Sequence, residues 1–306
     1  MQKSLTIFTP TFNRAYILPE LYNDLLNQTN KDFTWLVIDD GSHDNTEELA
    51  QKWKKDSKIN IEFFKQANGG KYTAINKSLE LCSTGYYAII DSDDRVTKNF
   101  VQVFFNNVDI ANNSDQLLGI CTPKHYSNSK HTCETYPKQN QSLFYNELKQ
   151  KYNYHGETTV VLKMDIIKDF RFPVFPKEKF MSEVLIGNEF FYKYRFLSIN
   201  NHISSSTYLN DGLTFNMMSL VYKNPYATAC VFKSYAHFKL KDGGSNSLIR
   251  HIKFHAWVSA FKLDQSKIPQ WPLKGFCNLI GKIASPITKL IYKQRNEKFK
   301  NGVTNI

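Results

Sequence analysis

Three acidic residues lie within four positions directly after a short apolar run. Asp91, Asp93 and Asp94 follow Tyr86–Ile90, whose apolar and aromatic residues predict a buried strand. Carboxylates this close repel one another when ionised, and burial raises the cost of each charge. A hydrated turn or a helix cap accounts for one or two of them. A divalent cation explains the cluster better, because Mg²⁺ usually binds one or two carboxylates together with substrate phosphates.

The chain before this cluster predicts an α/β fold with a parallel sheet. Strands are expected at 4–9, 33–38, 59–64 and 86–90, the first ending at Pro10 because proline has no N–H for the sheet ladder. Apolar residues at helical spacing follow each of the first three strands, and residues 44–47 resemble a capping box. This alternation is typical of βαβ units.

Polar residues follow each of the four predicted strands. They are Thr11 and Asn13, Asp39 and Asp40, Asn68 and Lys71, and Asp91 and Asp93. The carboxyl ends of parallel strands share one edge of the sheet, which is where open α/β sheets bind ligands. Any one set could be ordinary loop residues, but four sets in register favour a site for a nucleotide diphosphate and a metal. The chain has no GxxxxGK[ST] motif, and no GxGxxG motif follows the first strand, which disfavours P-loop and dinucleotide sites.

Four motifs resemble, in order and spacing, the nucleotide-sugar domain of family 2 glycosyltransferases. They are Pro10-Thr11-Phe12-Asn13-Arg14, Val37-Ile38-Asp39-Asp40-Gly41-Ser42, Asn68-Gly69-Gly70-Lys71 and Asp91-Ser92-Asp93. The resemblance covers residues 4–215. It implies a GT-A fold, a UDP-sugar or similar donor, a divalent metal (Mg²⁺ or Mn²⁺) and inversion at the anomeric carbon.

The resemblance also implies roles for individual residues. The implied donor-binding set is Pro10, Thr11, Asn13, Asp40, Lys71, Asp91 and Ser92. Within it, Pro10, Thr11 and Asp40 are expected to hold the base and ribose, Lys71 to lie near the base or phosphates, and Asp91 to reach the ribose. Asp93 is expected to hold the metal on the donor diphosphate, while Asp94 assists it or caps the turn.

An inverting transfer also needs a base that takes the proton of the acceptor hydroxyl. The segment 178–189 offers Glu178, Glu183 and Glu189, which would point in different directions on one helix because they lie five and six residues apart. The resemblance places the catalytic acidic residue in an E-x-F-x-x-E segment, so Glu183 is the expected base and Glu178 the alternative. Solvated helix charges remain an open reading. Asp211, in the later turn 208–214, is expected to contact the metal shell or an acceptor sugar, or to be purely structural.

The formal net charge of +11 is concentrated near the end of the chain. Residues 216–306 contain 15 Lys and Arg against 3 Asp and Glu, whereas the first 215 residues contain 24 against 25. The charge difference separates a near-neutral part from a basic one. With the resemblance over 4–215, it leads us to expect a GT-A domain at 1–215 and a basic, mainly helical region at 216–306. Lysines interleave with apolar residues over 274–293, after Trp271, as in helices that lie on anionic membranes. The alternative is a helix that packs on the domain, with a kink at Pro286.

Cysteine usage and the lengths of the hydrophobic runs bear on the compartment. Five scattered cysteines without zinc spacing predict neither a disulfide framework nor a structural zinc site, which fits a reducing compartment. Met1–Ser4 runs directly into a strand, so we expect no signal peptide, and no apolar run is long enough to span a membrane. The expected protein is cytoplasmic, peripheral on the inner face of the cell membrane, and acts on a surface-glycan or lipid-linked acceptor.

Two other functions remain open at this stage. The basic C-terminal region, with its aromatic residues, could bind nucleic acid, although this leaves the carboxylates after the strands unexplained. A nucleotidyltransferase would also use paired aspartates and Mg²⁺. The Gly-rich basic loop that such enzymes usually carry after the first strand is missing here.

Overall fold

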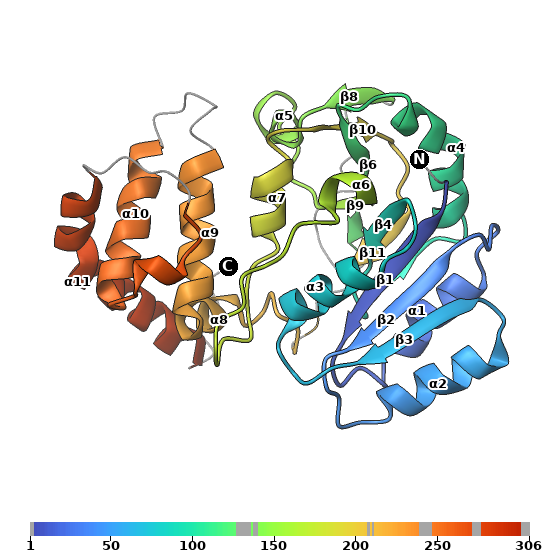
Figure 1. The fold of residues 1–306 in the computed structure, drawn as a ribbon, viewed down its shortest axis with the longest axis horizontal. Coiled ribbons are helices and arrows are strands. Elements are labelled where there is room, and N and C mark those ends of the chain that lie inside the picture. Colours follow the sequence, from blue (N-terminus) through green and yellow to red (C-terminus); the bar gives the residue numbers. More distant parts are fainter. Residues whose placement is uncertain are drawn as a thin grey trace. The chain divides into compact units, whose positions relative to one another are not determined.

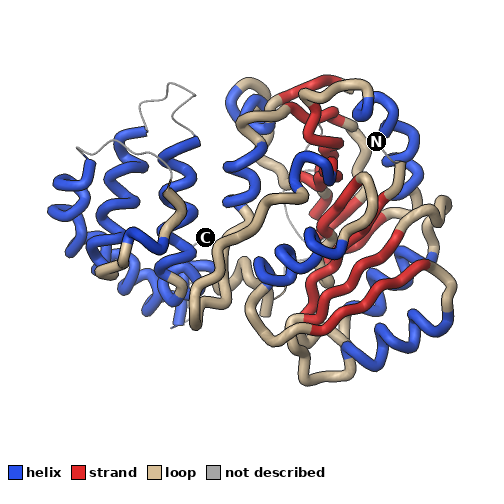
Figure 2. The backbone as a smooth tube through the Cα atoms, in the orientation of Figure 1, coloured by secondary structure: helices blue, strands red, loops and turns tan. Residues whose placement is uncertain are grey.

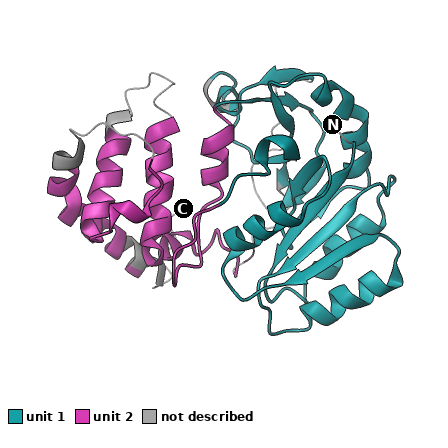
Figure 3. Ribbon diagram, viewed as in Figure 1, with its two compact units in different colours: residues 1–171, 193–208 teal, residues 172–192, 209–306 magenta. Residues whose placement is uncertain are grey.

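The computed structural model describes residues 3–126, 136, 140–206, 209, 211–238, 247–270 and 277–300. The chain forms two compact units (Figure 3). The first comprises residues 1–171 and 193–208, and the second comprises 172–192 and 209–306. The second unit therefore includes the segment 172–192, which carries the glutamates considered above, as well as the basic end of the chain.

Four parallel strands begin the first unit. They are β1 (Leu5–Thr11), β2 (Thr34–Asp39), β3 (Asn60–Lys65) and β4 (Tyr86–Ile89), arranged side by side as β3-β2-β1-β4 (Figure 1). Helices α1 (Leu18–Leu26), α2 (Thr46–Asp56) and α3 (Lys71–Leu81) follow the first three strands. The predicted βαβ alternation is confirmed, and the carboxyl ends of these strands do share one edge.

Buried aromatic residues hold helices against both faces of this sheet. On one face, Tyr22 of α1 stacks on Trp53 of α2 with ring centroids 4.3 Å apart, and both rings lie against Trp35 of β2. Helix α4 (Phe100–Asn112) contributes to the same apolar core. On the other face, Ser78 of α3 hydrogen-bonds the Tyr87 hydroxyl of β4. The strand ends are therefore fixed by packing on both sides.

The sheet continues beyond β4 with mixed pairing. Strand β9 (Thr158–Lys163) is antiparallel to both β4 and β6 (Leu117–Pro123), β10 (Arg195–Ser198) is parallel to β6, and β8 (Gln141–Leu143) closes the order. Short helices α5 (Tyr145–Gln150) and α6 (Met164–Ile167) flank β8 and β9 in sequence. A second sheet has the order β5 (Asp94–Val96), β11 (Ser204–Ser206), β7 (His125–Tyr126). Figure 2 shows the strands of the first unit in red.

The expectation that β1 ends at Pro10 is wrong. Strand β1 continues to Thr11, and Pro10 stays in register with Ile38 of β2. Backbone groups alternate sides along a strand, so Pro10 faces the same side as Phe8, whose carbonyl accepts from Ile90 N at 2.9 Å. Pairing with β4 stops at Ile89. The nitrogen of Pro10 therefore faces the β4 side beyond the last paired residues of β1 and β4. Its missing N–H removes no hydrogen bond from the sheet.

The second unit is helical over its described residues. Its helices are α7 (Val184–Phe190), α8 (Met217–Lys223), α9 (Pro225–Phe238), α10 (Ser247–Ala260), the short 3₁₀ helix η2 (Gln265–Lys267) and α11 (Cys277–Lys300). Apolar spacing predicts a single helix over 222–236, but Asn224 takes φ −123° and ψ 68° before Pro225 and separates α8 from α9. Fully buried Trp257 donates its indole N–H to the Pro225 carbonyl at 2.9 Å. Within the described ranges, no helix combines the length and apolar character needed to cross a bilayer.

Candidate active site

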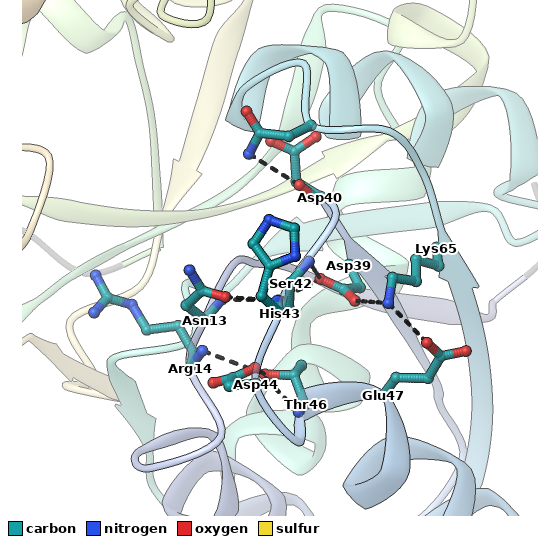
Figure 4. A network of polar contacts seen from close by, with 11 residues as sticks. Asn13, Arg14, Asp39, Asp40, Ser42, His43, Asp44, Thr46, Glu47 and Lys65 are labelled. Carbon is teal, nitrogen blue, oxygen red and sulfur yellow. Dashed lines mark hydrogen bonds and ion pairs between the residues drawn. The ribbon is translucent and has the colours of Figure 1, made fainter.

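The loops that follow β1 and β2 are tied together at the carboxyl edge of the sheet (Figure 4). Asn13 N donates to Ser42 Oγ at 2.7 Å, and Asn13 Oδ1 accepts from His43 N at 2.8 Å. Asn13 adopts φ 53°, a left-handed conformation that asparagine tolerates better than most residues. Asn13 therefore reaches the edge where it was expected, and both of these groups connect one loop to the other.

The two adjacent aspartates at the end of β2 have different surroundings. Asp39 is fully buried, and its Oδ1 accepts from the Ser42 backbone N at 2.9 Å and from Ser42 Oγ at 2.5 Å (Figure 4). These bonds hold a tight turn in which Gly41 has φ 84°, a conformation suited to glycine. Asp39 is thus a structural residue of the turn.

Asp40 instead organises the loop that leads into α3. Its Oδ1 accepts from Gln66 Nε2 at 2.7 Å and from Gly69 N at 2.9 Å, and its Oδ2 accepts from Gly70 N at 2.7 Å. Carboxylates that accept several backbone N–H groups fix those groups firmly. Because Lys71 follows directly, Asp40 sets the starting position of α3. Its expected contact with the base or ribose stays a prediction.

Thr11 has unused hydrogen-bonding capacity at this edge. Its carbonyl accepts from Asp40 N at 2.8 Å, but its hydroxyl, although the residue is only 3% exposed, has no partner among the described residues. Buried hydroxyls are nearly always bonded, so an unpaired one calls for an explanation. A bound ligand would provide it. Pro10 and Ser92, also in the expected donor set, are both buried.

Lys71 and Asp91 form an ion pair across two strand ends. The Lys71 Nζ lies 2.6 Å from Asp91 Oδ1 and 2.7 Å from Oδ2. Burial opposes ionisation of Asp91, but the Lys71 and Lys124 ammonium groups outweigh it and hold the pKa of Asp91 below its ordinary value. Both residues were expected to bind donor, and the structure brings them together.

Asp94 is held by two residues that the sequence did not indicate. Its Oδ2 lies 2.7 Å from Lys124 Nζ, and its Oδ1 accepts from Ser206 Oγ at 2.7 Å. Burial lowers the pKa of Lys124, but Asp94 and Asp91 outweigh it and raise that pKa overall. Ser206 ends β11 and lies opposite Asp94 in the second sheet, whereas Lys124 lies in the link between β6 and β7. Asp94 is therefore anchored rather than free to reach a ligand.

Asp93, between these two aspartates, forms no ion pair with any residue that the structure describes. The side chain is half-buried. Burial and the neighbouring charges of Asp91 and Asp94 raise the pKa of Asp93 above its ordinary value. Two of the three carboxylates thus have a lysine partner, and the one expected to hold the metal lacks one.

The donor groups around Asp93 fit a hard divalent cation that is shared with a ligand. Among the described residues, no three His, Cys, Asp or Glu side chains converge as a complete metal cage. Mg²⁺ typically uses one or two carboxylates and takes its remaining oxygens from water and substrate phosphates. One unpaired carboxylate at the strand edge matches that pattern better than a closed protein site.

Glu178, the alternative base, has a structural position in the second unit. It lies outside α7, is 8% exposed, and accepts from Tyr226 N at 2.9 Å through Oε1 and from Ala227 N at 2.8 Å through Oε2. These N–H groups belong to the first turn of α9, where backbone donors lack partners within the helix. Burial raises the pKa of Glu178. Helix α7 begins only at Val184, so Glu178 does not share a helix with Glu189, and its carboxylate instead caps α9.

Glu183 and Asp211 also lie in the second unit. Glu183 immediately precedes α7 and is half-buried, and the Glu183 carbonyl accepts from Ile186 N at 3.1 Å. Asp211 lies in an exposed turn, of which residues 208 and 210 are outside the described part. Their expected catalytic and acceptor-side roles stay predictions.

A comparison with family models decides the family. The model for glycosyl transferase family 2 matches residues 6–171, which is more than half of the chain. The chain belongs to this family. The matched segment contains β1 from its second residue, β2 to β4, all three aspartates of the cluster, and Lys124.

Relatives and solved structures agree with this assignment. The chain is 30% identical over 119 residues to the poly(ribitol-phosphate) beta-N-acetylglucosaminyltransferase TarP of Staphylococcus aureus, which covers 38% of this chain and 36% of TarP. It is similar to a crystal structure of S. aureus TarS residues 1–349 with UDP-GlcNAc, with a TM-score of 0.60 and 15% sequence identity. The match covers 98% of this chain and 92% of the TarS chain. It also resembles the solved complex of the mannosyltransferase PcManGT of Pyrobaculum calidifontis with GDP-Man and Mn²⁺, at a TM-score of 0.51 and 15% sequence identity. The match covers 97% of this chain and 84% of the PcManGT chain. The fold is therefore that of the GT-A glycosyltransferases, whereas the curated relatives match over less than two fifths of their own length.

Proposed function

We propose that this chain transfers a sugar from a nucleotide-diphosphate donor, with UDP as the nucleotide, to a hydroxyl group of a glycan or lipid-linked acceptor. The observation that carries the proposal is the charge arrangement after β4. Asp91 and Asp94 are each paired with a lysine at 2.6–2.7 Å, whereas the half-buried Asp93 between them forms no ion pair with a described residue. A site that retains an unfavourable charge usually does so for function.

The donor would lie along the edge where β1, β2 and β4 end. The unpaired Thr11 hydroxyl, the Asp40 carboxylate and the Asp91 carboxylate would hold the nucleoside, together with Pro10, Asn13 and Ser92 as the resemblance implies. Lys71 is already fixed at this edge by its ion pair, so a positive charge is available for phosphate oxygens. Family membership supports this assignment.

Asp93 would hold a divalent cation, Mg²⁺ or Mn²⁺, together with the donor diphosphate. Such a cation supplies neutralisation of the charge that develops on the departing diphosphate. The protein's own contribution is positional: Lys124 and Ser206 fix Asp94, Lys71 fixes Asp91, and the turn between these two residues holds Asp93 in place. The solved structure of PcManGT is a complex with GDP-Man and Mn²⁺, which supports a metal of this class.

We propose Glu183 as the base that takes the proton of the acceptor hydroxyl. A single displacement of this kind inverts the anomeric carbon, so an α-linked donor gives a β-linked product. The name of TarP specifies a beta-N-acetylglucosaminyl transfer with poly(ribitol-phosphate), which supports a polymeric acceptor and β stereochemistry. Glu178 is the weaker choice because both of its oxygens cap α9.

A screen of nucleotide sugars tests the proposal. Thermal unfolding would be measured with UDP-GlcNAc, UDP-glucose, UDP-galactose and GDP-mannose, each with Mn²⁺ and with EDTA. The proposal predicts that at least one UDP-sugar raises the melting temperature in Mn²⁺ and is slowly hydrolysed there, but not in EDTA. If no nucleotide sugar stabilises the protein under either condition, the proposed function is wrong.

A further inference from the structure

The last helix exposes a continuous stripe of large aliphatic side chains. On α11, Ile283 is 72% exposed, Ile287 63%, Leu290 54% and Ile291 41%. Their spacing of four, three and one residues puts them on one face, since successive residues turn by about 100°. Single exposed aliphatic side chains are ordinary on protein surfaces, but several adjacent ones usually mark a site that binds a protein, a ligand or a membrane.

This stripe is not the face that packs inside the second unit. Gly281 of α11 is buried against α10, where a side chain at its position would collide with His255, and Tyr292 contacts Trp257 edge-on with ring centroids 4.7 Å apart. Positions 281, 285, 288 and 292 lie on the packed side, roughly opposite the stripe. Helix α11 therefore packs on α10 with one face and exposes an apolar stripe on another.

Lysines lie along one border of the stripe. Lys282, Lys289 and Lys293 are exposed and share a face because they are spaced by seven and four residues. Over residues 277–300 the sequence has six Lys and Arg against one acidic residue, Glu297. A protein partner with a matching apolar surface would need no such excess of positive charge, whereas an anionic lipid surface would attract it.

We propose that α11 lies in the interface of an anionic lipid bilayer, with Ile283, Ile287, Leu290 and Ile291 inserted among the acyl chains and Lys282, Lys289 and Lys293 at the headgroups. A helix with an apolar face and a basic flank binds membranes through both contributions together. Trp271, which the sequence suggested as an aromatic entry point, lies outside the described residues. Lipid binding goes beyond the proposed sugar transfer and is measured without donor or acceptor.

Flotation with lipid vesicles tests this proposal. The full chain is expected to float with vesicles of phosphatidylcholine and phosphatidylglycerol, to float poorly with phosphatidylcholine alone, and to be released as salt rises. The triple variant Lys282→Gln, Lys289→Gln, Lys293→Gln should bind anionic vesicles on the order of 100-fold more weakly, since each basic residue contributes about fivefold. The triple variant Ile283→Ser, Ile287→Ser, Leu290→Ser should also lose binding.

Matched variants on α2 provide the control. Lys52, Lys54 and Lys55 are exposed in the first unit, so Lys52→Gln, Lys54→Gln, Lys55→Gln removes the same charge elsewhere and should leave flotation unchanged. Circular dichroism checks that every variant is folded. Equal loss of binding by the α2 and α11 lysine variants would overturn the proposal. It would also be overturned if the protein without lipid is a dimer that the serine variant converts to a monomer, because the stripe would then bind a second copy.

Discussion

The ammonium group of Lys71 contacts both carboxylate oxygens of Asp91, at 2.6 and 2.7 Å. This pair joins the first residue of α3 to the strand end at β4, across the edge where the donor is proposed to bind. Asp40 reinforces it from the other side by fixing Gly69 and Gly70. The arrangement neutralises one of three crowded carboxylates before any ligand arrives.

Removing one partner of this pair should destabilise the protein. Lys71→Met leaves Asp91 beside Asp93 and Asp94, and we expect the free energy of unfolding to fall by about 1–2 kcal/mol, less than for a fully buried pair because these side chains are 19% and 36% exposed. Urea denaturation of Lys71→Met, Asp91→Asn and the double variant gives the coupling energy. Strictly additive effects of the two substitutions would show that the pair contributes nothing.

The two glutamates near α7 should separate into a structural and a catalytic role. Glu178→Ala leaves two backbone N–H groups of α9 without an acceptor, so the free energy of unfolding should fall by roughly 2–3 kcal/mol. Glu183→Gln should change it by less than about 0.5 kcal/mol and abolish sugar transfer. Chemical denaturation and single-turnover transfer measure both. A stable Glu178→Ala variant without activity, beside an active Glu183→Gln variant, would reverse the assignment.

Buried His255 should make the second unit sensitive to acid. Neither ring nitrogen of His255 has a partner among the described residues, and burial, His251 and Lys233 lower its pKa from 6.5. The unfolded chain therefore binds a proton more readily, so the free energy of unfolding should decrease as pH falls below about 6.5 and level off below the folded-state pKa.

The matching measurement is thermal unfolding between neutral pH and pH 5, followed by circular dichroism. His255→Asn should flatten the loss of stability, whereas His155→Asn, at an exposed position of the first unit, should leave the profile as it is. An identical pH profile for the wild type and His255→Asn would rule out this histidine as the cause.

Gly281 should be required for α11 to pack on α10. A Cβ atom at this position would lie 2.3 Å from His255 Cβ and 2.8 Å from Ala256 N, much closer than real contacts allow. Gly281→Val should therefore cost about 1–3 kcal/mol and speed hydrogen exchange of the α11 amides. Lys289→Val places the same side chain at an exposed position of the helix and serves as the control. Equal protection of α11 in both variants would show that the packing does not depend on this glycine.

Sequence patterns predicted the elements whose signals are local. The four parallel strands, the helices between them and the shared polar edge all followed from apolar runs, helical spacing and the polar residues after each strand. The prediction at Pro10 was wrong because the effect of a proline depends on which side of β1 still has a neighbouring strand to hydrogen-bond. On the β4 side, this depends on where the pairing of β1 with β4 ends. Residues 44–47 also differed: Asp44 bonds Thr46 and Ala15, and no capping box forms.

Contacts between distant segments could not be predicted. Lys124 and Ser206 reach Asp94 from 30 and 112 residues away, and neither lies in a recognisable motif. Glu178 looked like a base because of its place in an acidic segment, yet its surroundings are set by Asn224 and Pro225, which start α9 beside it. Such residues acquire their roles only through packing.

The metal dependence of UDP binding tests the proposed role of Asp93 most directly. Isothermal titration calorimetry would compare the wild type with Asp93→Asn, each in Mn²⁺ and in EDTA. We predict that Mn²⁺ strongly tightens UDP binding to the wild type and has no such effect on Asp93→Asn. We also predict that, without metal, the free energy of unfolding of Asp93→Asn equals that of the wild type or exceeds it by about 0.5–1 kcal/mol. The reason is that the substitution removes a carboxylate charge that Asp91 and Asp94 repel. An unchanged gain in UDP affinity from Mn²⁺ in Asp93→Asn would contradict the proposed metal role.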